Sequence, residues 1–428
     1  MASSYPSRPM ISPDISAAAV PGSVRFLGKR RDYWRLLVRG GALLMVTLGI
    51  YRFWLATDVR RFLWSNTEVA GESLEYTGTP FELLIGFLMA IAILIPIYAA
   101  IFLAALDLGI VGKLSGMLGF VLLALLGQYA SYRARRYRLT RTIFRGLRFH
   151  QDGSAWRYAF CALFWWTMTT ITLGLAYPWQ QSRLERFKMR NTYYGDLAGS
   201  FEGSAFRLFL RGLPMWLLVV GPLVLAAGAL IETVDWLALA NVAQQGGDDV
   251  FARLEGASPG FGRAIVFAML MAGVAVFAFA LLYPAFQAMV LRWWTSGLRF
   301  GDIEVRSQLR TRHIYRAYFR FLWIAILFSI VVSVAAIPAA MLIGSIGDAN
   351  SSIGKEILAT GILLVGYVIV ALGYSTIYGA TVKLSLWQLG VESLQLSGLA
   401  ALDRVTATGG PSSALGEGLA DALHVGGY

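Results

Sequence analysis

The sequence has few of the residues from which catalytic, metal and redox sites are built. Its 428 residues include one cysteine and three histidines. The single cysteine, Cys161, excludes an internal disulfide, and no spacing of Cys and His residues resembles a metal site. The sequence also has no phosphate-binding Gly-Lys-Ser/Thr loop and no HExxH or GxSxG motif. We therefore predict no cofactor, no metal ion and no enzymatic activity.

Charged residues are scarce as well. They make up 14% of the chain, against roughly a quarter in soluble domains, while 57% of the residues are hydrophobic. The apolar residues are concentrated in charge-free runs long enough for a helix of about 20 residues to cross a bilayer. These runs are 83–106, 114–132, 158–182, 212–231, 264–291, 321–347 and 357–382. A shorter run at 40–51 lies between Arg39 and Arg52. We predict an all-α polytopic membrane protein with six to eight membrane helices.

The chain is basic, with a formal net charge of +12. Such a charge would suit a nucleic-acid partner, but the cytoplasmic loops of membrane proteins also accumulate Lys and Arg. We favour the second explanation, because most basic residues lie outside the apolar runs. We therefore expect the bilayer and its anionic lipid head groups as partners, and no nucleic acid. A protein partner and a homo-oligomer both stay open.

Part of the sequence recurs beside the apolar runs. The stretch 47–79 is repeated at 172–204, and weaker copies surround Arg136 and occupy 283–302. Each copy joins aromatic and basic residues at helical spacing to a short Gly-containing segment with alternating polarity. Such alternation around glycine is typical of hairpins. We predict internal repeats of the membrane helices, each followed by a small cytoplasmic β-hairpin.

The charge distribution predicts the topology. The loop 232–260 is acidic, which favours the outside of the cell membrane. The basic segments belong on the cytoplasmic side, which also places both termini there. These segments are 25–39, 52–61, 133–157, 183–211 and 292–320.

Two apolar runs conflict with this topology. The runs 40–51 and 158–182 each separate basic segments that should lie on the same side. Both contain a Thr-Leu-Gly copy (Thr47–Gly49 and Thr172–Gly174), so we expect both to behave alike. Either both are re-entrant or interfacial, which leaves six complete crossings, or both cross, which gives eight. We favour six.

The chain divides into four segments by composition. The Ser/Pro/Ala-rich start lacks the apolar core of a signal peptide, and the Gly/Ser/Ala-rich end lacks the spanning pattern. We predict a disordered leader at 1–23, a first membrane half at 24–130, the later repeats at 131–390 and a disordered cytoplasmic tail at 391–428.

Two repeated polar pairs are candidates for a functional site. Asn66-Thr67 and Asn191-Thr192 occupy matching places in the two best copies. They suit a pair of pseudo-symmetric positions lining a polar cavity in a repeat-built transporter. They also suit helix termination, because Asn and Thr readily bond to nearby backbone groups. We favour helix termination.

The repeated arginines Arg61, Arg136, Arg186 and Arg292 are the second set of candidates. Guanidinium groups bind phosphate head groups or other anions through paired hydrogen bonds. The same residues also suit anchoring at the bilayer surface, with side chains that reach up to the head groups. We favour anchoring, and lipid contact is compatible with both interpretations.

The repeated motifs occur in a fixed order along the chain. They comprise Thr47–Gly49, Trp54, Asn66, Thr67 and Gly78, the second copy Thr172–Gly174, Pro178, Trp179, Asn191 and Thr192, and the stretch Arg145–Phe149. In this order they resemble the YjgN-like bacterial inner-membrane proteins, a family of unknown function. The resemblance covers roughly 24–390 and implies a polytopic protein of the inner membrane, with no catalytic residue to carry over.

Two hypotheses of function follow. The first is a permease, or a protein that handles lipids or other amphipaths. The alternative is a membrane scaffold that transports nothing and whose basic cytoplasmic face binds anionic lipid or a protein partner. The spans at 83–106, 212–231 and 321–347 are almost wholly apolar, which disfavours ion-coupled transport.

Overall fold

The structure is a computed structural model of the whole chain. It describes residues 22–425, apart from 107–108, 238–239, 242–252, 254, 257, 347–352 and 411. Residues 1–21 of the expected leader and most of the acidic loop lie outside the described residues.

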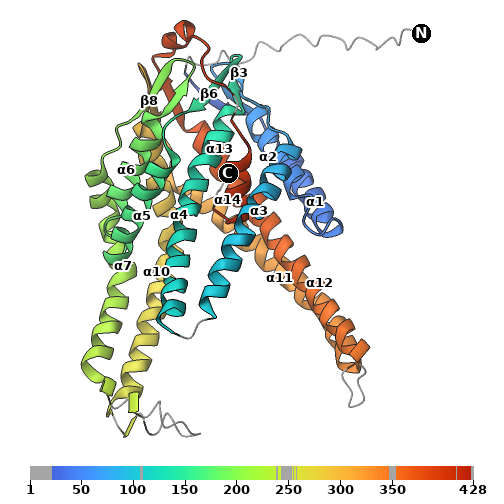
Figure 1. Cartoon of the computed structure of the whole chain (residues 1–428), viewed down its shortest axis with the longest axis vertical. Helices are drawn as coiled ribbons and strands as arrows, with labels where there is room; N and C mark the ends of the chain where they lie inside the picture. Colours follow the sequence, from blue (N-terminus) through green and yellow to red (C-terminus); the bar gives the residue numbers. More distant parts are fainter. Residues whose placement is uncertain are drawn as a thin grey trace.

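Short antiparallel strands gather at one end of the molecule, the upper end in Figure 1. β4 to β11 form an eight-stranded sheet in chain order, and β1 to β3 form a second, three-stranded sheet. A bridge between Ser23 and Gln395 connects the first strand to the last. The strands are β1 (Val24–Phe26), β2 (Thr67–Val69), β3 (Glu72–Ser73), β4 (Glu75–Tyr76), β5 (Thr142–Phe144), β6 (Leu147–Gln151), β7 (Thr192–Tyr194), β8 (Leu197–Phe201), β9 (Leu298–Phe300), β10 (Ile303–Ser307) and β11 (Leu394–Ser397).

Long helix pairs leave this sheet and return to it. One pair joins β4 to β5, another joins β8 to β9, and a third joins β10 to β11. Because each of these strand pairs is hydrogen-bonded, both ends of each helix pair lie at the sheet. The pairs are α3 (Pro80–Ala105) with α4 (Ile110–Thr140), α7 (Ala205–Thr233) with α10 (Phe261–Gly297), and α11 (Thr311–Ile346) with α12 (Ile353–Tyr378).

These helices account for the membrane-spanning part of the protein. Among the described residues, six helices are long and apolar enough to cross a bilayer. Their large apolar side chains point outward, as lipid-facing residues do; Phe102 is 65% exposed and Phe277 71% exposed. The polytopic helical fold predicted from the apolar runs is therefore confirmed.

Two shorter helix pairs also begin and end at the sheet. α1 (Arg30–Val46) and α2 (Arg52–Ser65) join β1 to β2, while α5 (Ala155–Ile171) and α6 (Tyr177–Arg190) join β6 to β7. β1 pairs with β2 and β6 pairs with β7, so neither helix pair ends on the far side. The structure therefore favours six crossings over eight.

The Thr-Leu-Gly copies form the turns of these short pairs. The Thr172 hydroxyl donates to the Met168 carbonyl at 2.8 Å and accepts from the Ala176 amide at 3.0 Å. Thr47 makes the same two contacts with its own neighbours. The following Leu and Gly adopt left-handed backbone in both copies, with φ of 51° at Leu173 and 93° at Gly174. This turn breaks the apolar run 158–182, so the run cannot cross as one helix.

The C-terminal segment differs from its prediction. α12 continues through a π-helical stretch (Gly379–Lys383) into α13 (Leu384–Glu392). After β11 come a 3₁₀ helix (Leu399–Arg404) and α14 (Leu415–Ala422), which packs against α3 and α4. The prediction of a disordered tail at 391–428 is therefore wrong for these residues. Its glycines mark close packing: a Cβ at Gly418 would lie 1.9 Å from the backbone of Gly86.

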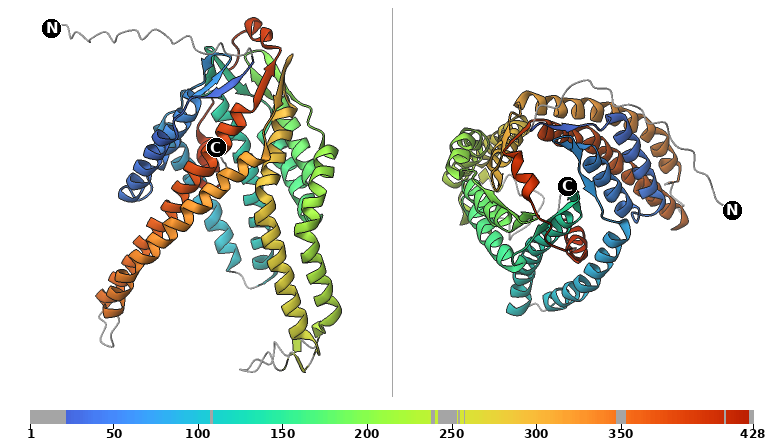
Figure 2. Two further views of the ribbon diagram at one scale, coloured as in Figure 1. Left: turned by 180° about the vertical axis from the view of Figure 1, so that it is seen from behind. Right: turned by 90° about the horizontal axis from the view of Figure 1, so that it is seen from above.

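The helix pairs stand side by side around a ring when the molecule is viewed from above, and the C-terminal end lies inside this ring (Figure 2). The buried apolar clusters lie mainly in the half nearest the sheet. One cluster joins β1, α1 and α2 to the π-helical stretch and α13, and another joins α3, α4 and α14. Farther from the sheet, the long helix pairs splay apart (Figure 1).

Candidate functional site

The repeated Asn-Thr pairs terminate helices. Asn66 and Asn191 are the C-caps of α2 and α6, and their side-chain amides donate to the carbonyls of Phe62 and Phe187, each at 2.7 Å. The neighbouring threonines donate to the carbonyl four residues earlier, also at 2.7 Å: Thr67 to Leu63 and Thr192 to Lys188. The helix-termination interpretation is confirmed for both copies, and the structure does not bring the two pairs together.

Three of the four candidate arginines make one recurring contact. Each donates from Nη2 to the carbonyl of a glycine at the start of the next helix. The contacts are Arg61 to Gly78 at 3.0 Å, Arg136 to Gly153 at 2.5 Å and Arg186 to Gly203 at 3.5 Å. The residue after each glycine caps the following helix: Thr79 caps α3, Ser154 caps α5 and Ser204 caps α7. These arginines join each helix to the start of the next and thereby set the position of the following helix.

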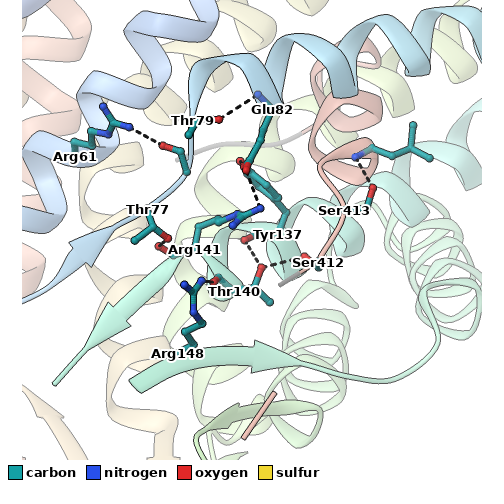
Figure 3. A network of polar contacts seen from close by, with 12 residues as sticks. Arg61, Thr77, Thr79, Glu82, Tyr137, Thr140, Arg141, Arg148, Ser412 and Ser413 are labelled. Carbon is teal, nitrogen blue, oxygen red and sulfur yellow. Dashed lines mark hydrogen bonds and ion pairs between the residues drawn. The ribbon is translucent and has the colours of Figure 1, made fainter. Parts of the chain in front are cut away.

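Polar contacts around the first of these junctions also connect α3, α4 and the C-terminal segment (Figure 3). The Glu82 carboxylate accepts from the Tyr137 hydroxyl at 2.7 Å and from Arg141 Nη2 at 2.9 Å. The hydroxyl groups of Thr140 and Ser412 lie 3.0 Å apart. The segment before α14 is therefore held against the sheet end of α4.

Arg292 differs from the other three candidates. Its Nε donates to the Ala288 carbonyl and its Nη2 to the Thr311 hydroxyl, both at 3.3 Å. It also lines a pocket of about 440 Å³ where α7 and α10 meet the sheet, which we call the basic pocket. The polar residues of this pocket are Glu202, Ser204, Arg207, Arg211, Arg292, Ser296, Arg299 and Ser307.

The basic pocket carries an excess of positive charge. Arg299 is paired, with its guanidinium 3.5 Å from Glu202 and 3.9 Å from Glu304. No carboxylate of the described part of the chain forms an ion pair with Arg207, Arg211 or Arg292. Since guanidinium groups pair well with phosphate and carboxylate, this pocket suits an anionic group.

An apolar pocket adjoins the basic pocket along the same two helices. It has a volume of about 310 Å³ and lies between the α5–α6 turn, α7 and α10. Leu208 and Met289 line both pockets. Farther along, its lining includes Leu213, Trp216 and Phe286. The two pockets together therefore present a cationic end near the sheet and an apolar end deeper among the spanning helices.

A buried charge cluster lies at α14, and the sequence interpretation missed it. Arg60 and Glu417 are each 6% exposed, and Arg60 Nη2 donates to Glu417 Oε1. Arg60 Nη1 donates to the Tyr76 hydroxyl at 3.1 Å, and Arg138 Nη1 lies 3.7 Å from the same Glu417 oxygen. Burial alone would lower the pKa of Arg60, but Glu417 and Tyr76 raise it, and the net shift is upward. Arg60 therefore stays protonated.

One signal in the sequence could have indicated this cluster. Leu415, Leu419 and Leu423 recur every four residues around Glu417, which is the spacing of an amphipathic helix. The many glycines and serines of the segment concealed it.

These features define a multi-pass membrane protein in which pairs of antiparallel helices connect the strands of sheets at one end of the molecule. The chain belongs to the DUF898 family, described as bacterial proteins of unknown function, whose family model matches residues 21–422. This confirms the resemblance drawn from the repeated motifs. Comparisons with curated proteins and with solved structures give no match.

Proposed function

We propose that this protein binds and handles an anionic amphipath, such as a lipid, in the bacterial inner membrane, and that it is not an enzyme. The observation that carries the proposal is that the basic pocket and the apolar pocket adjoin along α7 and α10, with Leu208 and Met289 lining both. An amphipath has the same two-part chemistry. Its anionic head would lie among Arg207, Arg211 and Arg292, and its chain would follow α7 and α10.

The energetics support such a ligand. Each methylene moved from water into an apolar site contributes about 0.8 kcal/mol, and a hydrogen bond to a charged group contributes about 1.5–3 kcal/mol. A lipid already in the bilayer gains little free energy when its chain enters the apolar pocket, because the chain is already out of water. Selectivity among lipids therefore comes mainly from the head group and the arginines around it.

The proposal places the sheet on the cytoplasmic side. Four of the five basic segments include strand residues, and the fifth, 52–61, covers most of α2, which ends at β2. Lys and Arg favour the cytoplasmic side. The basic pocket would then face the leaflet surface where anionic lipids attract positive charge. Both chain termini would be cytoplasmic. The recurring arginine–glycine contacts fit an internal repetition of the helix pairs.

A binding comparison tests the proposal. Purified protein in neutral detergent is titrated with fluorescent phosphatidylglycerol and with phosphatidylcholine carrying the same labelled chain. For the Arg207→Gln/Arg292→Gln variant, we expect the preference for phosphatidylglycerol to fall by about tenfold or more, since two charged contacts are lost. The Arg190→Gln/Arg306→Gln variant removes the same charge from exposed residues outside the pocket and should keep the preference. Equal losses in both variants would refute the proposal.

A scaffold is the second candidate function, and the basic face of α1 favours it. Arg31, Arg35 and Arg39 are exposed and follow one another at helical spacing beside Trp34. This face suits contact with an anionic membrane surface or an acidic partner. If the protein is a scaffold, replacing these three arginines with glutamine abolishes the lipid preference, while the basic-pocket variant keeps it.

A further inference from the structure

α14 occupies a groove on the inner side of the helix ring. Leu419 and Ala420 are buried against Ala90 of α3 and Ala130 of α4. Figure 2 shows the C-terminal end inside the ring, away from its outer surface. The short helix α14, near the end of the chain, therefore packs against two of the membrane-spanning helices.

This helix brings one carboxylate to two arginines. Glu417 meets Arg60 of α2 and Arg138 of α4, beside the Tyr76 hydroxyl. A buried arginine held beside a partly buried one is costly unless an anion lies between them. The three side chains from different elements therefore form an anion site, which the chain's own Glu417 fills.

Glu417 fills this site incompletely. Its Oε2 and the Nε of Arg60 are buried and have no hydrogen-bond partner among the described residues. A guanidinium group offers a pair of parallel donors that a carboxylate can accept together, and here only one carboxylate oxygen is bonded. A free carboxylate, which is not fixed to a helix, can accept from both Nε and Nη2 of Arg60.

The segment that leads to α14 is attached by exposed contacts at 403–406 and by the Thr140–Ser412 contact described above. Asp196 accepts from the backbone amide and hydroxyl of Thr406 at 3.0 and 2.8 Å, and both residues are exposed. Arg145 reaches Asp403, whose side chain is 76% exposed. Such exposed contacts contribute little to the stability of the docked segment, so they do not prevent α14 from leaving the groove.

We propose that Arg60, Arg138 and Tyr76 form an internal binding site for the carboxylate of an amphipath, and that α14 is a tethered occupant that competes with this ligand. Glu417 takes the place of the ligand carboxylate, and Leu419 and Ala420 take the place of its apolar chain. Ligand binding requires α14 to leave. The site is separate from the basic pocket, and the inference does not depend on the proposed function.

A disulfide between α14's end and α4 reports whether α14 is docked. A Cβ at Gly127 would lie 3.4 Å from Val425 Cγ1, which is close enough for a disulfide. The parent protein carries Gly127→Cys, Val425→Cys and Cys161→Ala, and the rate of disulfide formation is measured under mild oxidation. Glu417→Gln is added in one variant, and Asp421→Asn in a matched control that alters a half-exposed ion pair on the same helix.

We expect Glu417→Gln to slow disulfide formation about tenfold or more, and Asp421→Asn to change it less than about threefold. Sodium oleate should slow the reaction in the parent protein, and the uncharged monoolein should not. The oleate arm needs no charge substitution, so it stays informative if the Glu417→Gln protein does not fold. Three results would each overturn the inference: no disulfide in the parent, an unchanged rate in Glu417→Gln, or equal effects of oleate and monoolein.

Discussion

Replacing Gly418 with alanine gives a sharp test of how α14 is packed. A Cβ at this position would lie 1.9 Å from the carbonyl carbon of Gly86 and 2.1 Å from its oxygen. Both are backbone atoms, so no side-chain rotation relieves the overlap. α14 must move away from α3, and this movement pulls Glu417 from Arg60 and exposes Leu419.

Two effects of this substitution oppose each other. Alanine favours a helix over glycine by about 1 kcal/mol, which would stabilise α14. Overpacking against a fixed backbone costs about 1–3 kcal/mol, and separating a buried ion pair costs about 3–5 kcal/mol. The steric and electrostatic costs are larger, so we expect undocking to become easier by at least about 2 kcal/mol. This corresponds to roughly a thirtyfold rise in the population of the undocked state.

Hydrogen exchange of the α14 amides measures this change. We expect the segment 412–425 to exchange much faster in Gly418→Ala than in the unaltered protein. Gly410→Ala is the matched control, because a Cβ there meets no atom within 4 Å. Wild-type protection of α14 in Gly418→Ala would show that the helix does not pack against Gly86 as described.

Other features of the fold lead to further expectations. Thr172→Val removes the two hydrogen bonds that the Thr172 side chain makes to Met168 and Ala176, and in a denaturation assay it should lower the free energy of unfolding by about 1–2 kcal/mol. Thr167→Val removes one exposed hydrogen bond and should have little effect in the same assay. Arg136→Gln removes the contact to Gly153 and should destabilise the junction of α4 with α5 by about 1 kcal/mol in that assay, and stability equal to that of the parent would contradict the role given to this arginine. In a Cys161→Ala background, a cysteine at Ile110, the first residue of α4, should react with an impermeant maleimide added on the side of the membrane away from the sheet, while cysteines at Leu48 and Leu173 should not. Labelling at Leu173 from that side would mean that α5 crosses.

Two things could be predicted from the sequence: the spanning helices, and the conflict between the charge distribution and a full crossing of the runs 40–51 and 158–182. Length and lack of charge determine a span locally, so the run 83–106 lies within α3 except for its last residue, and the run 264–291 lies within α10. The return of α5–α6 to the sheet depends on the pairing of β6 with β7, which are far apart in the chain. No local pattern encodes that pairing. The left-handed backbone of Leu48 and Leu173 is equally hidden, because leucine rarely adopts it.

The charged sites were harder to predict than the spans. A basic residue near a membrane helix has the same local sequence whether it anchors the helix, bonds to a glycine carbonyl or lines a pocket. Arg186 and Arg292 occupy matching repeat positions, yet Arg186 contacts Gly203 and Arg292 lines the basic pocket. Arg60 is paired with Glu417, a residue almost at the other end of the chain. Only the tertiary structure separates these roles.

The central claim is that an anionic amphipath lies along α7 and α10 from the basic pocket to the apolar pocket. Photo-crosslinking with phosphatidylglycerol that carries a diazirine on its acyl chain, followed by peptide mapping, tests this claim most directly. The account predicts that the label concentrates on residues 208–220 and 279–289, and that Arg207→Gln/Arg292→Gln reduces this labelling. Label spread evenly over the outward faces of all the spanning helices, unchanged in that variant, would contradict it.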